Sequence, residues 1–74
     1  MPVALQMRMA RAALQLSVRD VAEKAKVSPN TVTKIESGEE VRPATMLALQ
    51  HAFETAGIEF LGDDGVRLKR KGKR

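Results

Sequence analysis

The chain has 74 residues, no cysteine and a single histidine. Without cysteine there are no disulfide bonds, and one histidine leaves too few ligands for a structural zinc site. The sequence also lacks an apolar run long enough for a signal peptide or a membrane span, so we expect an intracellular, cytoplasmic protein. Because suitable metal ligands are so few, we expect no metal, and we expect no other cofactor. A domain of this size depends on its apolar core, with association between chains as the remaining source of stability.

Aromatic residues are nearly absent, since the chain contains two phenylalanines and neither tyrosine nor tryptophan. Proteins that bind single-stranded nucleic acid stack the bases on aromatic side chains, so this composition disfavours that class. An enzyme is disfavoured as well, because the chain has no cysteine nucleophile, no glycine-rich phosphate loop and no carboxylate pair in an evident pocket. The adjacent Asp63 and Asp64 are better explained by a turn, and we expect no catalytic residue.

Basic charge is concentrated at the end of the chain. The formal net charge is +4, but the last six residues, KRKGKR, hold five of the 13 basic side chains and no acidic one. Residues 1–68 carry eight basic and nine acidic side chains, so the body of the protein is not basic. We expect residues 69–74 to form a basic, flexible tail. Such a tail either lies along nucleic-acid phosphates or is only a solvated end.

Apolar residues recur every three or four positions along most of the chain, which predicts helices over residues 4–14, 18–25, 29–36 and 43–56. Serine introduces each of the two middle helices. Ser17 precedes Asp20 by three residues, a capping-box spacing, and Ser28 precedes Pro29, which suits a first helical position. Gly38 suits the end of the third helix. The sequence thus predicts a mainly α domain with two short helices joined by a tight turn.

The third predicted helix has only two positions of a buried stripe, Val32 and Ile35. The side chains that we expect to remain exposed are short or cationic: Asn30, Thr31, Thr33 and Lys34. Asparagine can pair with adenine through both its carbonyl and its amino group, and threonine can donate a hydrogen bond or pack its methyl on thymine. A helix of this composition has the chemistry to enter a major groove and contact base edges.

Period-two alternation replaces the helical period after Gly57, and it predicts a β-hairpin over residues 58–68. Its apolar positions are Ile58, Phe60, Val66 and Leu68, with turn residues 62–65 between them. The free edge of such a hairpin can pair with the hairpin of a second copy, which would bury Ile58 and Phe60. The alternative is that the hairpin folds back on the helix of residues 43–56.

The stretch from Leu16 to Gly38 has the pattern L-S-x-x-x-V-A-x-x-A-x-V-S-x-x-T-V-x-x-I-E-S-G, and Arg42-Pro43 follows shortly. This pattern resembles the lambda-repressor-like, Cro-type helix-turn-helix family, also called the xenobiotic response element family of bacterial and phage regulators. The resemblance covers about residues 4–57. It implies a four-helix lambda-repressor-like DNA-binding domain over residues 1–57, followed by the hairpin as a candidate dimerisation element.

The resemblance also implies a function, which is that of a sequence-specific transcriptional regulator without a cofactor. We expect a dimeric repressor that reads an inverted repeat in double-stranded DNA with its third helix in the major groove. The expected DNA-binding residues are Ser17, Arg19, Ser28, Asn30, Thr31, Thr33, Lys34 and Arg42. The expected dimerisation residues are Ile58, Phe60, Val66 and Leu68, because small family members with a similar A-G-I-x-F strand look like dimers.

The sequence departs from the family pattern at two places. Val18 occupies a position where family members often have a phosphate-binding glutamine, and Glu39-Glu40 follow the third helix where a basic loop would suit DNA better. The acidic pair Glu39-Glu40 and the slightly negative charge of residues 1–68 keep an alternative function open. This alternative is a protein-interaction module, such as an antitoxin or an adaptor, with a protein partner.

Two further residues are expected to have structural or surface positions. Arg11 lies near the inner face of the first helix, and the family commonly joins this position to that of Glu36 by a partly buried ion pair. His51 is expected on a polar helix face.

Overall fold

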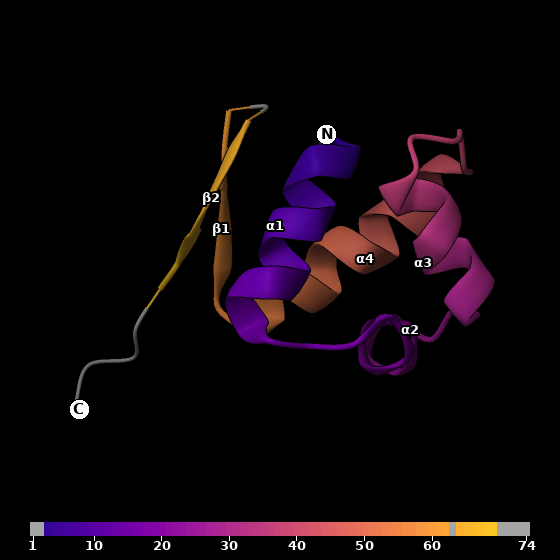
Figure 1. The fold of residues 1–74 in the computed structure, drawn as a ribbon, viewed down its shortest axis with the longest axis horizontal. Helices are drawn as coiled ribbons and strands as arrows, with labels where there is room; N and C mark the ends of the chain where they lie inside the picture. The colour runs from indigo at the N-terminus through magenta and orange to yellow at the C-terminus, as the bar shows by residue number, and fades with distance from the viewer. Residues whose placement is uncertain (1–2, 63, 70–74) are drawn as a thin grey trace.

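The computed structural model describes residues 3–62 and 64–69. Four helices precede a two-stranded hairpin (Figure 1). Their bounds are α1 (Ala4–Leu14), α2 (Val18–Ala25), α3 (Pro29–Glu36), α4 (Pro43–Thr55), β1 (Ile58–Leu61) and β2 (Gly65–Leu68). Each helix begins and ends within one residue of its predicted range. The mainly α fold predicted from the sequence is therefore confirmed.

The first two helices end without glycine. Gln15 follows α1 with φ 56°, and Lys26 follows α2 with φ 59°. Both residues adopt the left-handed conformation that glycine adopts without steric conflict. The Lys26 amide donates to the carbonyls of Ala22 and Glu23, which closes the last turn of α2 and starts the turn into α3.

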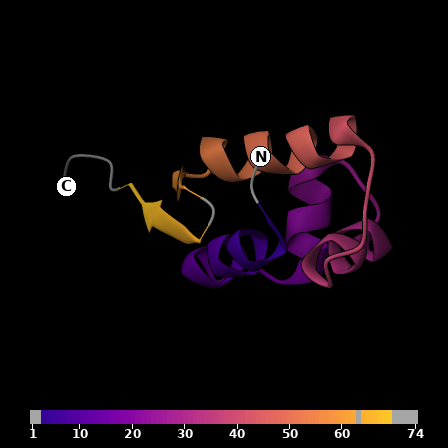
Figure 2. The same ribbon diagram turned by 90° about the horizontal axis from the view of Figure 1, so that it is seen from above.

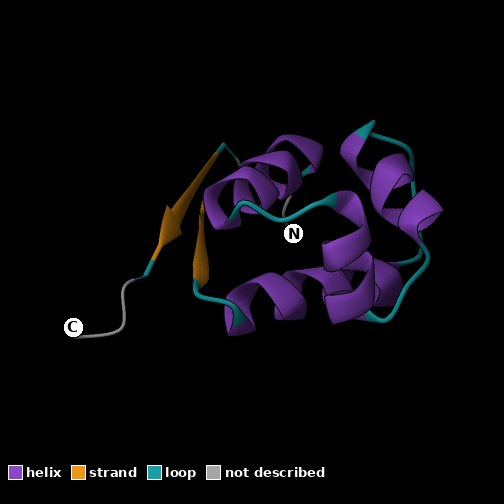
Figure 3. Cartoon of the chain, turned by 60° about the horizontal axis from the view of Figure 1, so that its bottom comes forward, coloured by secondary structure: helices purple, strands orange, loops and turns teal. Residues whose placement is uncertain are grey.

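The core lies between the four helices and the hairpin, and Figures 2 and 3 show the arrangement of these elements from two further directions. Every helix contributes to it, and so does β1. Its members are Met7, Ala10, Val21, Ala22, Ala25, Val32, Ile35, Leu49, Phe53 and Ile58. Because α2 and α3 place their few apolar residues in this core, most of their polar side chains face outward, with Glu36 as a buried exception.

The hairpin packs its apolar face against helices of its own chain. Ile58 is only 1% exposed, and the ring of Phe60 meets Phe53 of α4 edge to face, with centroids 6.3 Å apart. Strand β1 pairs antiparallel with β2, and Val66 lies opposite Phe60 and also packs against the core. The expectation that pairing with a second copy would bury Ile58 and Phe60 needs correction, since one chain alone already buries them wholly or partly. Leu68, at 42% exposure, is the most open of the four apolar positions.

A glutamine of α1 anchors the turn of the hairpin. Gln6 is fully buried, and its Nε2 lies 3.3, 3.1 and 2.9 Å from the carbonyl oxygens of Leu61, Gly62 and Gly65. Its Oε1 accepts from the amide of Val3, 3.0 Å away, at the start of α1. The side chain amide therefore joins two segments that are more than 50 residues apart in sequence.

No helix in the described part of the chain is long and apolar enough to cross a membrane. The predicted basic tail lies outside the described residues beyond Lys69, and so does Asp63 of the predicted turn. The turn itself begins at Gly62, which has φ 56°.

Candidate nucleic-acid interface

The α2-turn-α3 unit has a defined start at each helix. Ser17 Oγ accepts from the Asp20 amide at 3.0 Å, and Asp20 Oδ2 accepts from the Ser17 amide at 3.1 Å. This reciprocal capping box satisfies two amides that the helix itself leaves free. The hydrogen bond from the Ser17 amide, with a smaller contribution from the Ser17 hydroxyl, lowers the pKa of the Asp20 carboxyl below its ordinary value.

Helix α3 is capped by Ser28, whose Oγ accepts from the Thr31 amide at 3.2 Å. The hydroxyls of Ser28 and Thr31 are also 3.0 Å apart. Thr33 Oγ1 donates to the Pro29 carbonyl at 3.2 Å, so its hydroxyl hydrogen is used within the helix. Thr33 therefore still offers a methyl group and the lone pairs of its oxygen outward, whereas in the contact between Ser28 and Thr31 either hydroxyl can be the donor.

Two side chains of α3 remain open for a partner. Asn30, in the first turn, and Lys34, in the last turn, are both exposed. Among residues 3–62 and 64–69, neither side chain takes part in a hydrogen bond or an ion pair. Helix α3 lies at the end of the molecule opposite the hairpin (Figures 1 and 2). It is thus accessible to a large partner along its outer face.

The other predicted DNA-binding residues lie at helix starts. Ser17, Ser28 and Arg42 are the N-caps of α2, α3 and α4, and Arg19 is in the first turn of α2. All four are exposed. The unpaired amides and the positive dipole end make helix starts suitable neighbours for phosphate. Arg42 forms no ion pair with Glu39 or Glu40 in the part of the chain that the structure describes.

Val18 has a structural position rather than an outward one. Its side chain is partly buried and packs against the core. It therefore cannot replace a polar side chain as a phosphate ligand. Hydrogen-bond donors at the start of α2 come from the backbone and from Arg19.

The orientation of α3 is fixed from α1 by two arginines. Arg11 Nε lies 2.6 Å from Glu36 Oε2, and Arg11 Nη2 lies 3.0 Å from Glu36 Oε1, which makes the expected ion pair bidentate. Glu36 is 10% exposed and Arg11 is 29% exposed at the side chain. The hydrogen bond to Glu36 raises the pKa of Arg11 further above its already high value. Arg8 donates to the backbone carbonyl of Glu36, at the last residue of α3.

Sequence reasoning missed Arg8 and Gln6. Arg8 lies three residues before Arg11 and so shares a helix face with it. That spacing was a usable signal. Gln6 gave a weaker one, namely an amide next to the buried Met7, and its partners lie at the far end of the chain. His51 is exposed, and the described residues contain no group of three or more histidine or acidic side chains that could hold a metal ion.

Comparison with known proteins agrees with this geometry. A family model described as a helix-turn-helix domain matches residues 3–60, which include all four helices and most of β1. No curated protein matches the chain. A helix-turn-helix domain suggests DNA binding and implies DNA as the partner. The chain therefore belongs to the helix-turn-helix domain family.

Proposed function

We propose that the protein is a sequence-specific regulator of transcription, of the lambda-repressor-like class, that places α3 in the major groove of double-stranded DNA. The observation that supports this most is the division of α3 into two faces. Val32, Ile35 and Glu36 are buried, whereas Asn30 and Lys34 are exposed and form no side-chain hydrogen bond or ion pair with the described residues. A helix held firmly from behind, with polar side chains in front, suits direct readout of base edges.

Each residue has a role that its chemistry supports. Asn30 pairs with the edge of an adenine, and Lys34 donates to guanine or to phosphate. Thr33 contributes methyl contact and a hydroxyl oxygen, because its hydroxyl hydrogen already bonds to the Pro29 carbonyl, and Thr31 contributes its methyl group and its hydroxyl. The remaining contacts, from Ser17, Arg19, Ser28 and Arg42, position the protein on the backbone without reading sequence.

The protein acts as a homodimer that represses by occluding a promoter, most simply in the cytoplasm of a bacterium or in a phage-infected cell. Within the described residues, each hairpin strand has a partner on one side only, so the sheet retains outer edges for a second copy. The exposed Leu61 and Leu68 lie in these strands. A two-fold dimer presents two copies of α3 to the half-sites of an inverted repeat.

Selection of bound sequences from a random duplex pool tests the proposal. The wild-type protein should enrich an inverted repeat at physiological salt. Asn30→Ala and Thr31→Ala should relax the preference at one or two positions of each half-site. Gln50→Ala, on a different helix, should leave the motif unchanged. A wild-type protein that enriches no motif contradicts the proposal.

Light scattering after size exclusion tests the dimer at micromolar concentration. We expect the mass of two chains, and a shift toward one chain when Leu61 and Leu68 are changed to lysine. A monomeric wild-type protein contradicts dimerisation through the hairpin. DNA binding by a single domain is then tested by the selection experiment alone.

A protein-interaction module, such as an antitoxin or an adaptor, is the second candidate. It is favoured by the exposed Glu39 and Glu40 beside α3 and by the lack of excess basic charge in residues 1–68. If the selection enriches no motif, this candidate replaces the regulator.

A further inference from the structure

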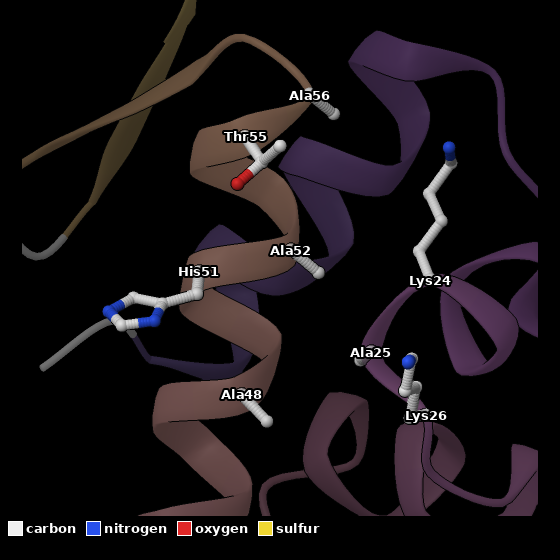
Figure 4. A pocket seen from close by; sticks show the side chains of 8 residues that line it. All are labelled: Lys24, Ala25, Lys26, Ala48, His51, Ala52, Thr55 and Ala56. Carbon is white, nitrogen blue, oxygen red and sulfur yellow. The ribbon is translucent and has the colours of Figure 1, made fainter.

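A groove of about 420 Å³ lies between α2 and α4, and the proposed DNA contacts do not use it. Ala48 and Ala52 of α4 and its C-cap residue Ala56 point toward α2, and Figure 4 shows them facing Lys24 and Lys26. His51 points away from the groove in the same view. The groove thus has a wall of methyl groups on one side and two ammonium groups on the other.

Two lysines line the groove on the side of α2. Lys24 and Lys26 are exposed, and no ion pair involves either of them in residues 3–62 and 64–69. Lys26 belongs to the turn that leads into α3. The cationic side of the groove therefore lies next to the start of the proposed recognition helix.

An acidic segment lies at the other end of α3. Residues 39–42 form an irregular connection to α4, in which Glu39 and Glu40 are exposed. The Glu39 carboxylate accepts from Ser37 Oγ at 3.3 Å, which orders it without neutralising it. No ion pair involves Glu39 or Glu40 in the described part of the chain. Helix α3 has eight residues and so separates the two patches by about 12 Å along its axis.

We propose that the groove between α2 and α4 receives Glu39 and Glu40, from the acidic connection of a second copy of this protein bound beside it on DNA. Opposite charges at opposite ends of one helix favour contact between two molecules. The small alanine side chains let an extended backbone approach α4 closely, while Glu39 and Glu40 reach Lys24 and Lys26. The inference rests on the proposed DNA binding.

The arrangement of charge also decides how two copies meet. If acidic connections met each other, or lysine pairs met each other, like charges would repel. Unlike patches pair either head to tail or reciprocally about a two-fold axis. In both cases the carboxylates near the DNA backbone gain cationic neighbours, so binding of one copy assists binding of the next.

Binding to one site and to two adjacent copies of the selected site measures the effect. Because exposed ion pairs each contribute about 0.5 kcal/mol, two of them correspond to on the order of fivefold cooperativity at low salt. Screening should remove most of it near 0.5 M salt. Templates with direct and inverted arrangements and stepwise spacings identify the geometry. Loss of single-site binding would contradict the proposed function, whereas normal single-site binding without cooperativity at any spacing contradicts only this inference.

A charge exchange gives the sharper test. The variant Glu39→Lys/Glu40→Lys and the variant Lys24→Glu/Lys26→Glu should each lose cooperativity, because each then opposes like charges. A mixture of the two variants restores both junctions and should recover cooperativity. If the mixture stays non-cooperative, the contact is wrong. If Lys24→Glu/Lys26→Glu weakens single-site binding but leaves cooperativity intact, the lysines contact phosphate instead and the inference fails.

Discussion

Both carboxylate oxygens of Glu36 are held by the guanidinium of Arg11, at 2.6 and 3.0 Å. Glu36 is the last residue of α3 and Arg11 lies in the last turn of α1, so the pair fixes the end of α3 against α1. Because the side chain of Glu36 is only 10% exposed, removing this guanidinium would leave a carboxylate in the protein interior without its ion-pair partner.

Arg11→Met should destabilise the protein by about 2–3 kcal/mol, which is below the usual range for a buried pair because Arg11 keeps 29% of its side chain exposed. Denaturant unfolding measures this. Arg67→Met is the matched control, since Arg67 pairs with Glu59 on the open surface of the hairpin and should change stability by less than about 1 kcal/mol. The double variant Arg11→Met/Glu36→Leu should regain much of the loss. Equal losses for Arg11→Met and Arg67→Met would contradict the structural role of the pair.

Gln6→Leu should destabilise the protein by about 1–3 kcal/mol, because the carbonyls of Leu61, Gly62 and Gly65 then lose their buried donor. Relative to the wild-type protein, hydrogen exchange of the hairpin amides should accelerate more in this variant than exchange of the α2 and α3 amides. Gln50→Leu serves as the comparison, because Gln50 only bonds to the exposed Glu54 of its own helix. Uniform acceleration across the whole domain would argue against a specific anchor for the hairpin.

Asp20 makes the start of α2 sensitive to acid. Its folded-state pKa is lowered, chiefly by the Ser17 amide, so its contribution to stability is present above the ordinary aspartate pKa of about 3.9. That contribution is lost as the pH falls through the lower folded-state value. NMR titration of the carboxyl should show the lowered pKa, and Ser17→Ala should raise it only in part, because the amide hydrogen bond remains. A titration at the ordinary value would show that the capping box is open in solution.

Arg42→Ala should weaken binding by a similar factor for all DNA sequences and reduce the salt slope of the binding constant by about one, as expected for a phosphate contact. Fluorescence anisotropy at a series of salt concentrations gives both quantities. Arg67→Ala, on the hairpin at the opposite end from α3, should leave the slope unchanged. A loss confined to particular base pairs would instead assign Arg42 to direct readout.

The helices follow closely from the sequence because their signals are local. Serine caps, Pro29, Pro43 and the three-to-four spacing of apolar residues all act within one or two turns. The Arg11–Glu36 pair was accessible only through the family resemblance. The packing of the hairpin could not be predicted, because alternation shows which side chains share a face but does not show what covers it. Gln6 had only a weak local signal, since its partners are backbone carbonyls, which every sequence has.

In the turn between α2 and α3, a lysine occupies a left-handed position at which glycine would be more stable. Lys26 has φ 59°, a conformation that costs a non-glycine residue about 1–2 kcal/mol, partly offset by the greater chain entropy of glycine when unfolded. Lys26→Gly should therefore raise the free energy of unfolding by up to about 1 kcal/mol. The same change removes an ammonium group from the groove, so the more stable variant should be the less cooperative one on adjacent DNA sites. A variant that gains stability and keeps full cooperativity would show that the Lys26 side chain makes no contact with a second copy on an adjacent DNA site.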